Sequence, residues 1–438
     1  MSEDLTLKDL ASFEEAYQQT PLANVLARTV QENGVVKASK NYAAKKKHDR
    51  TVSIEVKTGK ITNQKKSGRC WLFATLNVLR QQVVDKLKVK DFEFSQNYDS
   101  FYDRLEKTNF YYEKMIELAD RPNDDREYLF YLDWGNSDGG QFANGAALIE
   151  KYGLVPKSVM PETYTSEHTA ELNDVLNLKL KKDTVTLRQM HQDGASDEEL
   201  RTFKKEQMKD VYRMLVYAFG QPPVEFDFEY RDDDNNYHID RHLTPKDFLE
   251  KYVDFKAEDY TSLVDAPDHE LGGHFNMPSQ EYIFNGPKVD FLTVATKELK
   301  DAVIAQLKDG KAVWFGCDVL KDMDRKEGIL DTEYFKQDEL FGLDLALDKK
   351  KRLESREAAC SHAMAFTGVD LVEGKPTKWK VENSWGDENG DKGYFIMTDA
   401  WFDAYVYEII VDKKYLTKAQ QEIAAKAVKP LAPWDSLA

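Results

Sequence analysis

The segment that decides the fold is Asn63–Trp71, with the sequence NQKKSGRCW. A turn containing Gly68 precedes apolar residues at helical spacing, so a helix is predicted to begin at Cys70. A thiol at a helix start lies near the positive end of the dipole and beside unpaired N–H groups, which favour the thiolate. The chain can fold back so that the side-chain amide of Gln64 lies beside the thiol. Together with the Cys70 N–H, this amide can stabilise an oxyanion. A buried cysteine alone more often only packs, but this combination indicates a nucleophile.

Two later segments contain candidate partners for this thiol. His362 lies in CSHAM (residues 360–364), where small neighbours let the ring approach the thiol and act as base and then acid. Asn383 follows 21 residues later, in VENSWG (residues 381–386). Its side-chain oxygen can accept the imidazole N–H, and Trp385 can shield that hydrogen bond from water. Together with Trp71 beside the thiol, these residues predict a cysteine–histidine–asparagine site.

The string Asp138-Gly139-Gly140 precedes a predicted helix over residues 141–151. Two glycines allow an extended peptide to approach and pair with the backbone. Most such pairs are only turns, but the position of this one predicts a substrate-binding ledge.

Composition and charge exclude several classes of function. The chain has 438 residues and a formal net charge of −17, which disfavours nucleic acid and anionic membranes as partners. Three widely spaced cysteines form neither a disulfide framework nor a metal motif, and no metal or organic cofactor is needed. No secretory signal or run of about 20 apolar residues is present, so a cytoplasmic location is expected. Cys317 and Cys360 are predicted to pack as small apolar residues, with an accessory oxidation role for Cys360 as the alternative.

Helical patterns dominate the first half of the chain and strand patterns the last third, which predicts an α+β enzyme with a β-barrel-like lobe. The middle contains a capping box at Ser196 and an acidic turn after residue 231 that lacks the glycine and glutamate of a calcium loop. The predicted regions are an N-terminal arm (1–60), a helical lobe with the nucleophile (61–161), an inserted helical and hook region (162–280), a β-rich lobe with the histidine and asparagine (281–412) and a C-terminal arm (413–438).

The order of these motifs resembles that of the papain superfamily. The nucleophile and histidine are 292 residues apart here, against about 130–150 in papain-like enzymes, which places a large insertion in the middle of the chain. Arg69 stands where the papain pattern has serine or alanine, and we expect it to face solvent or the rim of the cleft.

A closer resemblance, over nearly the whole chain, is to the bleomycin hydrolase and aminopeptidase C family. It is carried by SGRCW (67–71), DGGQ (138–141), YGLVP (152–156), VWFGCD (313–318), HAM (362–364), WKVENSWG (379–386) and YVYE (405–408). The resemblance implies a papain core with helical and hook-like insertions. It also implies a homohexamer whose active sites face an internal channel, and a cytosolic enzyme that trims short peptides.

In that family the C-terminal arm lies in the cleft and its carboxylate fixes the amino group of the substrate, which implies that Ala438 binds substrate. Bacterial members commonly have six residues after the Pro-Trp-Asp string, and this sequence has three. At roughly 3.3 Å per residue the arm reaches about 10 Å less far. This difference predicts an oligo-endopeptidase, with aminopeptidase action as the alternative. A binding protein that has kept the fold but lost catalytic activity is disfavoured, because the cysteine, histidine, asparagine and glutamine are all present.

Overall fold

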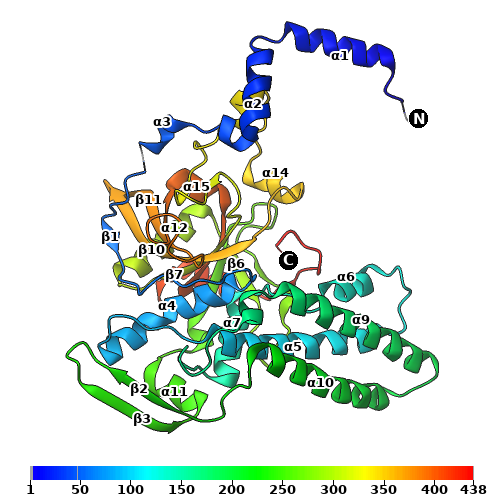
Figure 1. The fold of residues 1–438 in the computed structure, drawn as a ribbon, viewed down its shortest axis with the longest axis vertical. Coiled ribbons are helices and arrows are strands. Elements are labelled where there is room, and N and C mark those ends of the chain that lie inside the picture. Colours follow the sequence, from blue (N-terminus) through cyan, green and yellow to red (C-terminus); the bar gives the residue numbers. More distant parts are fainter. Residues whose placement is uncertain (1–2, 47, 438) are drawn as a thin grey trace.

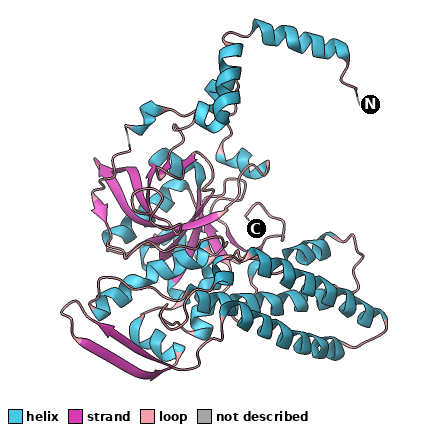
Figure 2. Ribbon diagram, viewed as in Figure 1, coloured by secondary structure: helices cyan, strands magenta, loops and turns pink. Residues whose placement is uncertain are grey.

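Helices and strands separate into two lobes in the computed structural model, which describes residues 3–46 and 48–437 (Figure 2). The predicted α+β class is confirmed. At the N-terminus, α1 (Leu7–Gln19) and α2 (Ala23–Ala38) extend away from both lobes (Figure 1). The predicted arm does not stay apart over its whole length, because β1 (Ile54–Glu55) pairs with β10 of the sheet. Among the described residues, no helix has the length and apolarity needed to cross a membrane.

The helical lobe is organised around α4, which runs from Cys70 to Leu87 as the apolar spacing predicts. Its apolar residues are almost fully buried: Leu72, Leu76, Leu79, Val83 and Leu87. The other helices of this lobe are α5 (Gln96–Glu117), α6 (Arg126–Trp134) and α7 (Phe142–Tyr152). The helix predicted over residues 141–151 is therefore confirmed as α7.

The inserted middle region consists of long helices and a hairpin. Its elements are α8 (Tyr164–Glu167), α9 (Ala170–Gln192), α10 (Asp197–Phe219), β2 (Phe226–Arg231), β3 (Tyr237–Leu243), α11 (Pro245–Tyr252) and the short η1 (Ala257–Asp259). The capping box at Ser196 is confirmed, because its Oγ accepts from the Glu199 N–H and the Glu199 carboxylate accepts from the Ser196 N–H. In the turn after β2, the carboxylate of Asp232 accepts hydrogen bonds from Asn236 and contacts His238.

Twelve strands in the described part of the chain form one sheet, in the order β14-β5-β6-β4-β13-β7-β10-β11-β12-β9-β8 with β1 beside β10. Their bounds are β4 (Tyr260–Val264), β5 (His274–Asn276), β6 (Asp290–Thr293), β7 (Val313–Cys317), β8 (Met323–Asp324), β9 (Ile329–Leu330), β10 (His362–Val372), β11 (Lys375–Glu382), β12 (Tyr394–Thr398), β13 (Val406–Asp412) and β14 (Lys429–Pro430). The remaining helices are α3 (Tyr42–Lys45), η2 (Pro278–Gln280), α12 (Thr296–Lys308), α13 (Gln337–Phe341), α14 (Lys349–Glu354), α15 (Asp399–Tyr405), η3 (Lys413–Tyr415) and α16 (Lys418–Ala424).

The two faces of β7 serve different cores, because successive side chains of a strand point to opposite sides. Phe315 and Cys317 pack with α12 and α15 in the core of the β-rich lobe. Trp314 packs instead with the helical lobe and donates a hydrogen bond from Nε1 to the Trp71 carbonyl, 3.1 Å away. A buried ion pair at 2.7 Å between Arg80 and Glu382 joins the lobes a second time. These two contacts therefore hold α4 against β7 and against the end of β11.

Candidate active site

Cys70 is the first residue of α4 and borders a cavity of about 280 Å³ at the junction of the lobes. His362, Trp71 and Gly140 border the same cavity. Burial raises the pKa of the Cys70 thiol, and N–H groups of the chain, among them that of Ala363, act in the opposite direction. Because Ala363 directly follows His362, the thiol lies against the strand that carries the predicted base.

His362 begins β10, is 7% exposed and has a defined hydrogen-bond partner. Its Nε2 lies 2.9 Å from Oδ1 of Asn383, an acceptor, so Nε2 carries the proton and Nδ1 presents its lone pair. The ring of Trp385 lies 4.7 Å from the imidazole, centroid to centroid, and shields this hydrogen bond. Burial lowers the pKa of His362 to about 4. Burial disfavours the charged form of each group by itself, and a thiolate beside an imidazolium offsets that cost.

Gln64 and Asn383 are held in place by a residue that the sequence reasoning missed, Ser384. Oδ1 of Asn383 also accepts from the Ser384 N–H at 2.8 Å, and the Ser384 hydroxyl donates to Oε1 of Gln64 at 2.6 Å. One N–H of the Gln64 amide donates to the Ser67 carbonyl at 2.6 Å. Among the described residues this amide has no second acceptor, but Gln64 does not border the catalytic cavity, so its role at the oxyanion stays a prediction. The only sequence signal for Ser384 is its place next to Asn383.

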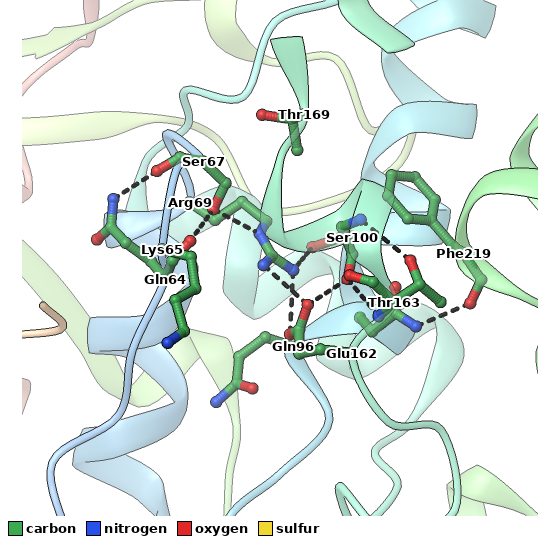
Figure 3. Close-up of polar contacts among 12 residues, drawn as sticks. Gln64, Lys65, Ser67, Arg69, Gln96, Ser100, Glu162, Thr163, Thr169 and Phe219 are labelled. Atoms are coloured by element: carbon green, nitrogen blue, oxygen red, sulfur yellow. Dashed lines mark hydrogen bonds and ion pairs between the residues drawn. The ribbon is translucent and has the colours of Figure 1, made fainter. Parts of the chain in front are cut away.

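Arg69 corrects a sequence expectation, because it is buried and does not face solvent or the cleft rim. It is 3% exposed and donates two hydrogen bonds, at 3.2 and 2.9 Å, to the carboxylate of Glu162, as Figure 3 shows. It also donates to the hydroxyls of Ser67 and Ser100. The residue before Cys70 points back into the helical lobe, where a guanidinium requires a partner. That partner is 93 residues away in the sequence, so the local pattern could not reveal it.

The predicted substrate ledge divides into two parts with different surroundings. Gly139 and Gly140 border the catalytic cavity, and a side chain on Gly140 would place its first carbon 2.6 Å from the Trp71 ring. The carboxylate of Asp138 is occupied elsewhere: it accepts from the Gly68 N–H at 2.8 Å. It also accepts from Oγ1 of Thr169 and pairs with Arg104. The carboxylate of Asp138 therefore fixes the turn before the nucleophile, and substrate binding by Asp138 stays a prediction.

The C-terminal tail, defined here as residues 431–437, lies between the two lobes (Figure 1). Ser436 and Leu437 border the catalytic cavity. Arg356 donates to the carbonyls of Trp434 and Asp435 at 2.5 and 2.9 Å. Ala438, predicted to bind substrate, lies outside the described residues.

His269 provides a second set of contacts to the tail. Its ring nitrogens lie 2.8 Å from Asp268 and 3.1 Å from Asp435, and these two carboxylates raise the pKa of His269 to about 9. The Ser436 hydroxyl also donates to Asp268, at 2.6 Å. Polar contacts from Arg356 and from Asp268–His269 therefore hold the tail at the edge of the catalytic cavity.

Comparisons with known proteins agree with this arrangement. The model of the Peptidase C1-like family matches residues 4–438. Aminopeptidase G of Lactobacillus delbrueckii subsp. lactis is 47% identical and Aminopeptidase E of Lactobacillus helveticus 46% identical, each over 100% of both chains. The crystal structure of PepW from Lactobacillus rhamnosis HN001 (DR20) is 47% identical, covers 100% of this chain and 99% of its own, and superposes with a TM-score of 0.96. The chain belongs to the Peptidase C1-like family and is a papain-like cysteine peptidase.

Proposed function

We propose that this cysteine peptidase is a cytoplasmic oligo-endopeptidase that cleaves short peptides at internal bonds. The observation that supports internal cleavage is the placement of the tail. Ser436 and Leu437 form one wall of the catalytic cavity and leave about 280 Å³ open between the thiol, Gly139–Gly140 and Tyr282. The proposal requires that an extended substrate pass Ser436 and Leu437 on the amino side of the scissile bond.

The site geometry supports acyl transfer through a thioester. Nδ1 of His362 takes the proton of Cys70 as Sγ attacks the carbonyl carbon of the peptide. The oxyanion accepts hydrogen bonds from the Cys70 N–H and the free amide N–H of Gln64. His362 then returns the proton to the leaving amine, which leaves an acyl group on Sγ. A water molecule, deprotonated by His362, hydrolyses the thioester and regenerates the thiol. Asn383 keeps the imidazole in the required tautomer.

Aminopeptidase action is the second candidate, and the tail also supports it. Because Ser436 and Leu437 border the same cavity as Cys70, the tail lies where it can meet the amino end of a bound peptide. Relatives over the full chain are named aminopeptidases. The two candidates therefore differ in how far a substrate extends past the tail.

One decapeptide distinguishes the two, offered with a free and with an acetylated amino terminus, with and without prior iodoacetamide. Endopeptidase action predicts internal fragments from both forms in mass spectra, all abolished by iodoacetamide. Stepwise loss of single residues from the free form alone would contradict the proposal and establish the aminopeptidase.

We also propose self-association into a homohexamer through the N-terminal helices. Support comes from α1, in which no described residue is buried, although large apolar side chains lie along it and continue into α2. Their exposed fractions include 85% for Leu7, 59% for Phe13 and 71% for Leu22. Light scattering coupled to size-exclusion chromatography should give six times the 50.5 kDa chain mass, and Phe13→Glu should lower it. A wild-type protein of the mass of one chain would contradict this proposal.

A further inference from the structure

Lys107 is a buried lysine of α5 that the mechanism above does not use. Its side chain is 0% exposed, although a lysine is rarely fully buried unless it is paired. One turn earlier on the same helix, Asp103 forms an ion pair with Nζ at 2.7 Å. Burying an ammonium group is costly even in such a pair, because a single carboxylate does not replace its hydration. The other two contacts of Nζ show what this charge holds in place.

Three successive carbonyls of the predicted ledge accept hydrogen bonds from the helical lobe. Nζ of Lys107 donates to the carbonyl of Ser137 at 2.9 Å and to that of Gly139 at 2.5 Å. Between them, the carbonyl of Asp138 accepts from Nε1 of Trp71 at 2.7 Å. Because Trp71 follows the nucleophile in α4, these contacts fix the ledge relative to the thiol.

The next residue of the ledge, Gly140, has free backbone groups. Among the described residues, neither its N–H nor its carbonyl forms a hydrogen bond within the chain, and Gly140 borders the catalytic cavity. Free backbone groups of this kind can pair with an extended peptide. Two adjacent glycines have little conformational preference of their own, so the ledge keeps one shape only through its contacts with the helical lobe.

We propose that Lys107 is a positioning residue for the substrate. By holding the carbonyls of Ser137 and Gly139 toward the helical lobe, it orients Gly140 to pair with the backbone of the substrate residue that precedes the acylating one. Lys107 itself touches neither the substrate nor the reacting atoms. The inference rests on the proposed internal cleavage, because only then does the substrate have a residue on the amino side of the one that forms the thioester.

The surroundings of Lys107 keep it charged and in place. Nζ lies 5.5 Å from the ring centroid of Trp71 and 5.1 Å from that of Tyr282, and both rings favour a cation. The Tyr282 hydroxyl donates to the second oxygen of Asp103 at 2.5 Å, which orients that carboxylate. Burial lowers the pKa of Lys107 to about 8, and Asp103 opposes that shift, so the ammonium form predominates at pH 7.

The test uses an acetylated tripeptide aminomethylcoumarin amide and three analogues, each methylated at one of the peptide nitrogens that precede the scissile bond. Methylation removes one hydrogen-bond donor and changes no side chain. For the wild-type enzyme we expect methylation at one position to lower kcat/KM at least about fivefold, the effect of one lost hydrogen bond.

The variant Lys107→Met has a side chain of similar length without donors. For the unmethylated peptide, its KM should rise at least about fivefold while kcat stays within about twofold, because the lost interaction is one of binding. Methylation should then cost less than about twofold at every position. Lys114→Met is the matched control: Lys114 also lies on α5 and over two aromatic rings, but it donates to Glu117. It should retain the wild-type KM and the methylation penalty.

A second variant guards against misfolding, because Lys107→Met leaves the Asp103 carboxylate buried without its cation. Lys107→Met combined with Asp103→Asn removes both charges and keeps an acceptor for Tyr282, and the same kinetic changes are expected once circular dichroism shows a native spectrum. The inference alone is overturned if methylation has no effect on the wild type at any position, or if the penalty persists in a folded variant. If the wild type cleaves free-amino peptides but no acetylated one, internal cleavage is refuted and the proposed pairing at Gly140 falls with it.

Discussion

The catalytic centre and the C-terminal tail border the same cavity but are held in place by different kinds of contact. His362 and Asn383 are 7% and 1% exposed, lie at the start of β10 and just after β11, and are joined by a buried hydrogen bond. The tail has almost no regular structure and is fixed mainly by Arg356, an exposed residue, and by the histidine between Asp268 and Asp435.

We infer from this difference that the catalytic residues set the rate of cleavage, whereas the tail sets which substrates are cleaved. A buried hydrogen bond between rigid elements tolerates little movement, because breaking it leaves an unpaired polar group. The contacts of Arg356 lie at the surface, where such contacts are weaker and more easily changed. We therefore expect substitutions at the centre to change the rate for every substrate alike, and substitutions around the tail to change which substrates are cleaved.

The largest effect is expected from the nucleophile. Cys70→Ala removes the proposed nucleophile, so turnover should fall by at least about a thousandfold for all peptides. The measurement is single-turnover cleavage of the decapeptide, with circular dichroism to confirm folding. Cys360→Ala is the matched control and should keep its turnover and its sensitivity to iodoacetamide. Thiol-dependent cleavage that persists in Cys70→Ala would place the nucleophile elsewhere.

The next largest effect is expected from Gln64, the proposed oxyanion donor, and from Ser384, which orients it. Gln64→Ala removes a donor to the oxyanion and should lower kcat about a hundredfold. Ser384→Ala leaves the Gln64 amide in place but removes the hydroxyl at 2.6 Å that orients it, so a loss of about tenfold is expected. Both changes should leave the cleavage positions unaltered. A shift in cleavage position with either variant would show that the centre also controls substrate choice.

Sequence reasoning predicted the fold class and the helix that starts at Cys70, because local apolar spacing and a glycine turn determine them. It also selected the residues that the structure gathers around one cavity: Cys70, His362, Gly139 and Gly140 at its wall, with Asn383 bonded to His362. It was wrong on Arg69, and it did not foresee the contacts of the Asp138 carboxylate, because their partners lie on other segments of the chain: Glu162, Arg104 and Thr169. Long-range ion pairs leave no periodic pattern in a sequence, so only the folded structure reveals them.

A smaller effect is expected from loosening the tail. Arg356→Ala removes two hydrogen bonds to tail carbonyls, and because Arg356 is exposed the loss should be modest. The ratio of cleavage of a long acetylated peptide to that of a short one should rise about twofold to fivefold, with turnover of the short peptide unchanged. Lys350→Ala, an exposed cation on α14 near Arg356 in sequence, is the control and should leave the ratio alone. An equal fall in both rates would show that Arg356 supports the catalytic centre.

The smallest effect is the pH dependence of the tail. The pKa of His269 is raised from 6.5 to about 9 by Asp268 and Asp435, so the contribution of the charged imidazole to tail docking is fully present below pH 6.5 and is lost as pH rises through about 9. The pKa values of both aspartates are lowered, so their contribution is lost only in acid, below their usual range. The ratio of long-peptide to short-peptide cleavage should therefore rise between pH 8 and pH 10 in the wild type. Because both peptides use the same thiol and imidazole, titration of the catalytic centre cancels in that ratio.

The variant His269→Gln keeps the ring volume partly filled but cannot be protonated. Its ratio of long-peptide to short-peptide cleavage should therefore be higher at pH 7 and independent of pH up to 10. If the variant showed the same rise as the wild type, another group would have to control the tail, and the separation of substrate choice from chemistry would no longer depend on this histidine.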